Sequence, residues 1–133
     1  MNQNEPRENP RTIIIQKLYS HHLNKDSEIT FSKHRYKKFI KDVVNGTIER
    51  KELILDMIKN DLKDDVNDNR TDILVKLIIM SAIYEFMYMH KTPIKVIISE
   101  YLKASDFFIE NTQKNYLNAI LDKAAKISRT INE

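Results

Sequence analysis

The sequence contains no cysteine, which removes several kinds of chemistry at once. Disulfide bonds, thiolate metal sites and cysteine nucleophiles all require a residue that the chain does not have. Nothing covalent therefore staples a fold of these 133 residues, a length typical of one domain. The composition is compatible with a reducing compartment, and we expect a cytoplasmic protein.

Glycine and proline are also scarce, with one and three residues. Many short strands joined by tight turns would need more of both, whereas the Lys, Ile, Leu, Glu and Ala residues of the chain suit helices. A single glycine also excludes a Gly-rich phosphate loop and a nucleophile elbow. The composition predicts an all-α fold.

A long apolar run is missing as well. The longest one, residues 77–82, continues only to Met87 with Glu85 inside it, and falls short of the ~20 residues of a membrane-spanning helix. Residues 1–11 are polar and charged and lack the apolar segment of a signal peptide. We therefore expect neither membrane insertion nor export, and the apolar run predicts a buried central helix.

The net charge of +3 is modest, but its distribution is uneven. Residues 7–41 contain nine basic and three acidic side chains, a balance typical of a surface that binds a polyanion. A solvated helix surface would explain the same balance. The basic cluster at residues 33–38 belongs to no motif, and solvated surface is the interpretation that we favour for it.

Hydrophobic periodicity predicts a flexible arm at residues 1–10 and one helical domain at residues 11–133. The first helix covers residues 11–24. Residues 32–62 form one long helix or two with a kink near Asn45-Gly46, and residues 73–89 form the central helix. Further helices follow Thr92-Pro93 and a cap at Asn111 or Thr112. Asn69 or Thr71 is available to cap the central helix, and Thr92 to cap the next one.

No catalytic or metal site is predicted. His21 and His22 are adjacent and point about 100° apart on a helix, and the other two histidines lie in separate segments. Glu85 and Glu100 lie beside apolar stripes, and a buried carboxylate is more often a structural ion-pair partner than an acid or base. We predict no cofactor, and an enzyme is disfavoured.

Three stretches carry a resemblance to a known family. Residues 11–19 (Arg-Thr-Ile-Ile-Ile-Gln-Lys-Leu-Tyr) resemble the opening helix of the transcription antitermination factor NusB family. Residues 81–86 and 93–100 resemble its Ala-x-Tyr-Glu-Leu and Pro-x-x-Val-x-Ile-Asn-Glu motifs. Residues 115–123 are similar to its Lys-Phe-Val-Asn-Gly-Val-Leu-Asp-Lys motif, and residues 39–46 add a weaker match.

The resemblance implies an all-α fold of about six or seven helices in two three-helix halves. It also implies binding of the boxA element, a single-stranded RNA signal of ribosomal RNA transcripts, by a heterodimer with the ribosomal protein NusE. Other Nus factors and RNA polymerase would complete an assembly that resists termination. The free protein would be a monomer or a homodimer.

Five residues are the predicted RNA contacts. Single-stranded RNA is held by cations that follow the phosphates and by aromatic side chains that stack on bases. The arm supplies the cations, and the last helix could complete a groove if it packs beside the first. For Tyr19 and Tyr116, which would supply the aromatic rings, core packing is the alternative. The predicted contacts are Arg7, Arg11, Tyr19, Lys114 and Tyr116.

Departures from the family pattern affect the expected partner surface and RNA affinity. Val75 stands where an acidic residue is common and Met80 where arginine is usual, and we place the partner interface at Val75 and Lys76. Two acidic residues dilute the arm, which predicts weak intrinsic RNA affinity and a strong dependence on the partner. The alternatives are an adaptor with little RNA binding and a detached module of the kind found in ribosomal RNA methyltransferases.

Overall fold

The computed structural model describes residues 9–66 and 71–131, which contain six α-helices, one short 3-10 helix and no strand. This confirms the predicted all-α fold. None of the helices in these two ranges is both long and apolar enough to cross a membrane. The helices are α1 (Pro10–Leu23), α2 (Lys37–Glu49), α3 (Lys51–Asp61), α4 (Ile73–Tyr88), α5 (Ile94–Ser105), η1 (Asn111–Gln113) and α6 (Lys114–Ile131).

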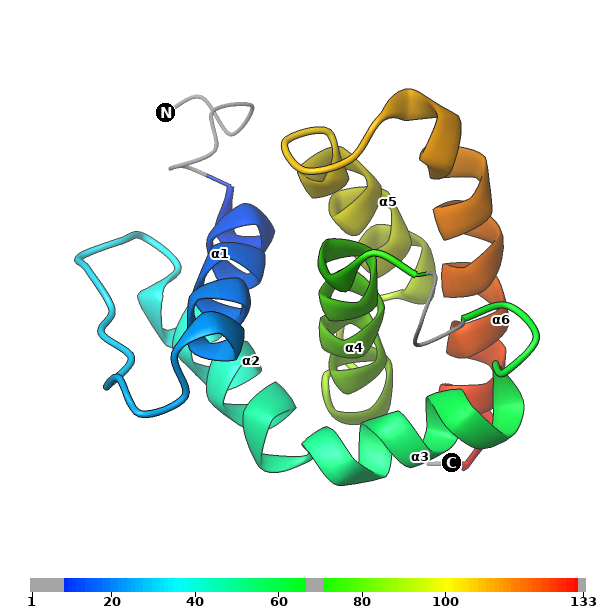
Figure 1. Ribbon diagram of the computed structural model, residues 1–133, viewed down its shortest axis with the longest axis horizontal. Coiled ribbons are helices and arrows are strands. Elements are labelled where there is room, and N and C mark those ends of the chain that lie inside the picture. The colour runs from blue at the N-terminus through cyan, green and yellow to red at the C-terminus, as the bar shows by residue number, and fades with distance from the viewer. Residues whose placement is uncertain (1–8, 67–70, 132–133) are drawn as a thin grey trace.

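Helix α4 forms the centre of the domain. Eleven of its sixteen residues are buried, and it packs against each of the other five α-helices. Figure 1 shows α4 in the middle, with the N-terminal helices α1–α3 and the C-terminal helices α5 and α6 arranged around it. A helix that is apolar on nearly every face can be stable only in such a position. The predicted buried central helix is therefore confirmed.

The last helix does not pack beside the first one. Helix α6 packs on α4, α5 and η1, whereas α1 packs on α2, α4 and α5. The two helices consequently lie on opposite sides of α4 (Figure 1). The groove that depended on α1 and α6 being neighbours is not formed.

The residues that cap the helix starts differ in several cases from the predicted ones. Helix α1 begins at Pro10, and the Asn9 side chain accepts hydrogen bonds from the next two free amides. Asp72 caps α4 by accepting a bond from the Leu74 amide at 2.7 Å, so Thr71 is not the cap; Asn69, the other predicted cap, lies outside the described residues. At α5 the N-cap position is occupied by Pro93 instead of Thr92.

The break between α2 and α3 lies at Arg50, four residues after the predicted kink at Gly46. Gly46 instead lies within α2, where it is buried against α4. A Cβ atom added at Gly46 would overlap the ring of Tyr84. The glycine therefore permits a close approach of two helices and does not end one.

This contact predicts that Gly46→Ala changes stability in opposite directions with and without the Tyr84 ring. Gly46→Ala should destabilise the wild-type protein by about 1–3 kcal/mol, because the new methyl group displaces the Tyr84 ring. In a Tyr84→Ala background the same change should stabilise by roughly 0.5–1 kcal/mol, since alanine is the better helix former. Urea unfolding of the wild-type protein, the two single variants and the double variant gives both changes in the free energy of unfolding. Equal effects in the two backgrounds would contradict the packing role of Gly46.

Candidate nucleic-acid interface

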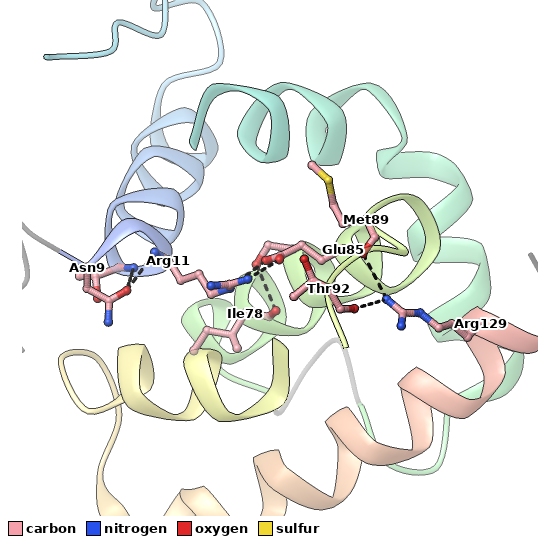
Figure 2. Close-up of polar contacts among 9 residues, drawn as sticks. Asn9, Arg11, Ile78, Glu85, Met89, Thr92 and Arg129 are labelled. Carbon is pink, nitrogen blue, oxygen red and sulfur yellow. Dashed lines mark hydrogen bonds and ion pairs between the residues drawn. The ribbon is translucent and has the colours of Figure 1, made fainter. Parts of the chain in front are cut away.

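A buried ion pair joins the first turn of α1 to α4. The Arg11 guanidinium donates from Nη2 to Glu85 Oε1 at 2.6 Å and from Nε to Oε2 at 3.1 Å. Glu85 is fully buried and Arg11 is 8% exposed. Figure 2 shows the Arg11 side chain reaching from α1 toward Glu85. Glu85 is thus a structural ion-pair partner, as the sequence predicted for a buried carboxylate.

Aromatic rings enclose this ion pair. The guanidinium carbon lies 5.0 Å from the centre of the Phe39 ring and 5.3 Å from that of Tyr101. Burial lowers the pKa of Arg11, but attraction and hydrogen bonding to Glu85, with smaller contributions from Tyr101 and Glu100, together outweigh it, and the net pKa is raised. The guanidinium therefore stays charged, and its contacts link α1, α2, α4 and α5.

Arg11 was predicted to contact RNA, and the structure places its charged group in the interior. A phosphate could reach the guanidinium only if the bonds to Glu85 were broken. The residue instead holds the beginning of α1, immediately after residues 1–8, which include the other predicted arm cation, Arg7, and lie outside the described residues. The visible role of Arg11 is to anchor the point from which this arm starts.

The first turn of α6 carries two other predicted RNA contacts. Tyr116 is 39% exposed, and its hydroxyl donates to the backbone carbonyl of Asp65, in the segment that follows α3. The Asp65 carboxylate in turn accepts a bond from Lys123 Nζ at 2.7 Å. Lys114 pairs with Asp106 at 2.5 Å. Tyr116 thus presents part of its ring to solvent while its hydroxyl is held in place.

Tyr19 lies apart from this region, on α1. It is half-buried and packs against the hydrophobic core. Because α1 and α6 flank α4 on opposite sides, Tyr19 and Tyr116 do not form the two walls of one groove (Figure 1). Any ligand that contacts both must extend across the surface of the domain.

The two residues of the predicted partner interface face different hollows. Val75 is 1% exposed and borders a hollow that Tyr116 also lines. Lys76 borders a second, largely apolar hollow of about 210 Å³ between α1, α2, α3 and α4, lined also by Met80 and Leu77. Consecutive helical positions point about 100° apart, which separates the two side chains.

Lysines gather at the hollow beside Lys76. Burial lowers the pKa of Lys51, and the nearby positive charges of Lys25 and Lys76 lower it further. A hollow with an apolar floor and crowded cations at its edge favours a partner that offers apolar side chains and a carboxylate. Lys76 was predicted from the sequence to contact a partner, whereas Lys51 and Lys25 were not predicted, because they come from distant segments of the chain.

Arg129 is a structural residue that sequence reasoning missed. From α6 it donates to the carbonyl oxygen of Phe86 at 3.1 Å. It also donates to the carbonyl oxygens of Thr92 at 2.9 Å and Met89 at 3.3 Å (Figure 2). The contacts with Phe86 and Met89 satisfy carbonyls left free at the C-terminal end of α4, and the contact with Thr92 holds the connection to α5. A basic residue in the last turn of a helix gives no signal, in sequence, that it caps a different helix.

The fold and its surfaces define a small helical domain built around one central helix, with hollows that are lined by apolar and cationic side chains. A model of the NusB family matches residues 8–126. The chain therefore belongs to the NusB family, which confirms the resemblance seen in its motifs.

Individual relatives agree with this assignment. The transcription antitermination protein NusB of Rickettsia bellii is 31% identical over 115 residues, covering 84% of this chain and 73% of that protein. Its counterpart in Mesorhizobium japonicum is 28% identical over 89 residues, covering 67% of this chain and only 57% of that protein. A solved structure of T. maritima NusB has the same fold, with a TM-score of 0.73, 22% identity and 92% of each chain covered.

The buried ion pair makes a prediction about stability. Arg11→Met should lower the free energy of unfolding by about 3–5 kcal/mol, because it leaves Glu85 buried without its partner. The double variant Arg11→Met/Glu85→Leu should recover most of this loss, since no unpaired charge remains. Denaturant unfolding gives both values, with Lys38→Gln, which breaks an exposed pair with Asp42, as the control without measurable effect. Equal losses in the single and double variants would contradict this account.

Tyr101 makes a second prediction, at alkaline pH. Burial, and then the Glu85 carboxylate, raise the pKa of Tyr101 well above its ordinary value. The folded state therefore keeps the tyrosine proton after the unfolded state has lost it, so stability falls as the pH rises above about 10. Tyr101→Phe should lose stability less steeply there, by up to about 1.4 kcal/mol per pH unit. Unfolding curves at several pH values test this, and parallel slopes would refute it.

Proposed function

We propose that this chain binds boxA-type single-stranded RNA of ribosomal RNA transcripts as a heterodimer with the ribosomal protein NusE, and so helps RNA polymerase to resist termination. Membership of the NusB family, through a match over residues 8–126, is the observation that carries the proposal. The names of the Rickettsia and Mesorhizobium relatives support the antitermination role. Other Nus factors would join the assembly, and no catalytic step is involved.

The proposed RNA surface has two parts. Tyr116 offers a partly exposed ring whose hydroxyl is held by Asp65, and Lys114 lies two residues before it. An aromatic ring held in one orientation loses little freedom when a base stacks on it. Tyr19 and the arm cation Arg7 would form the second part, on the α1 side. Arg11 serves this part indirectly, by anchoring the first turn of α1 to Glu85.

The proposed partner surface is the apolar hollow beside Lys76. Its lining combines apolar side chains of α3 and α4 with Lys51 and Lys76, so it suits a protein segment with apolar and acidic groups. Val75, the other residue of the predicted interface, is buried; it would act by shaping the neighbouring surface around Tyr116.

Fluorescence anisotropy with a short boxA-like RNA and a scrambled RNA tests the proposal. We expect selective binding that becomes tight mainly when the NusE-type protein is present. Tyr116→Ala should then weaken RNA binding at least about fivefold, since loss of one stacked base costs about 1–3 kcal/mol. Tyr116→Phe, which loses only the hydroxyl bond to Asp65, should have a smaller effect.

Leu53→Ala provides the matched control, because Leu53 is also an exposed large apolar side chain, 49% exposed, but lies on α3. It should leave RNA affinity unchanged. Partner binding without RNA selectivity would replace the proposal with a protein adaptor. Absence of binding to either would refute it.

A further inference from the structure

A hollow of about 420 Å³ lies between α1 and the segment that leads into α2. One wall is formed by Gln16 and Lys17 of α1, and the other by residues 31–35 and the start of α2. Figure 1 shows this segment looping away from the helical core on the α1 side of the molecule. The hollow is separate from the surface around Tyr116 and from the hollow beside Lys76, because it shares no lining residue with either.

Four cations line this hollow, namely Lys17, Lys33, Arg35 and Lys37, and no carboxylate does. None of the four forms an ion pair with a residue in the described ranges. Glu28 lines an adjoining hollow, which shares Lys17 with this one. Like charges held around a concave surface without counter-charges create a positive potential that attracts a polyanion.

The floor of the hollow is apolar and aromatic. Ile13 and Ile40 line it together with Phe31, whose ring centre lies 6.0 Å from Lys17 Nζ. The His34 ring is held in one position, because its Nδ1 accepts a hydrogen bond from the Tyr36 amide at 2.9 Å. Cations that can follow phosphates, beside a surface on which bases can lie, are the two components of single-strand recognition.

We infer that this hollow, defined by Lys17, Phe31, Lys33, Arg35 and Lys37, binds a single-stranded RNA segment that flanks the one held at the α1 and α6 surfaces. The inference rests on the proposed function, which it extends to a second contact region. Phosphates lie against the four cations, and an unstacked base lies on the apolar floor. The basic cluster at residues 33–38, together with Lys17, is then a binding surface and not only a solvated helix start.

The four cations of this hollow would also attract an acidic protein segment. The rings of Phe31 and His34 favour RNA, because every base offers a face for stacking whereas Asp and Glu side chains do not. The test therefore also measures the affinity of each variant for the NusE-type protein in the absence of RNA.

The test compares two double variants that each remove two positive charges. Lys33→Gln/Arg35→Gln changes the hollow, and Lys59→Gln/Lys95→Gln changes exposed lysines of α3 and α5. Affinity is measured across a salt series, with the NusE-type protein present, for a boxA-like RNA and for the same RNA extended on both sides by unstructured nucleotides. Circular dichroism verifies that both variants are folded.

For the extended RNA, the hollow variant should flatten the plot of log affinity against log salt by about 1.4, since each single-strand phosphate contact contributes about 0.7. Its affinity near 0.15 M salt should fall on the order of tenfold, while the control changes less than about twofold. Adding Lys17→Gln, from the opposite wall, should flatten the slope by roughly another 0.7.

Each other outcome identifies what has failed. If the wild-type protein binds the extended RNA and the hollow variant matches it in affinity and slope, the hollow does not bind RNA while the proposed function stands. If the variant loses affinity for the NusE-type protein in the absence of RNA and keeps RNA binding, the hollow is a protein site and the inference is overturned. If the wild-type protein binds neither RNA, the proposed function and this inference both fail.

Discussion

The buried pair between Arg11 and Glu85 is the interaction on which the arrangement of the domain depends. It is the charged contact that fixes the first turn of α1 against the central helix, with Phe39 and Tyr101 closing around it from α2 and α5. Two charges removed from water are costly unless they are paired with good geometry, so the pair tolerates only one placement of α1. The beginning of the described chain is thereby given a defined position and direction.

The position of α4 decides where the surfaces lie. This helix packs against all five other α-helices, with α1 and α6 on opposite sides of it, so the exposed residues of α1 and α6 do not share one cleft. The surface around Tyr116, the hollow beside Lys76 and the basic hollow beside Lys17 are consequently three separate regions. Under the proposed function, the protein partner and the RNA would therefore occupy different regions of the surface.

Much of the fold could be predicted, because it depends on local patterns. The all-α class follows from the scarcity of glycine and proline, and the buried central helix from the apolar run ending at Met87. Gly46 was misread because a glycine in a helix weakens it locally, whereas here the ring of Tyr84 from another helix determines what fits. The ion pair of Arg11 was out of reach for the same reason: a basic residue next to a polar arm resembles a ligand contact, whereas its partner Glu85 lies 74 positions later in the sequence.

The sequence by itself determined the helices, the buried face of each and the family, since these depend on residue type and on spacing within a short window. The tertiary structure decided which charges are available. It buries Arg11 and pairs Lys114 with Asp106, and it brings Lys17 across from Lys33, Arg35 and Lys37 around one hollow. The physical reason is that the effect of a charge depends on the distance to its neighbours and on their access to water, and packing between distant segments sets both.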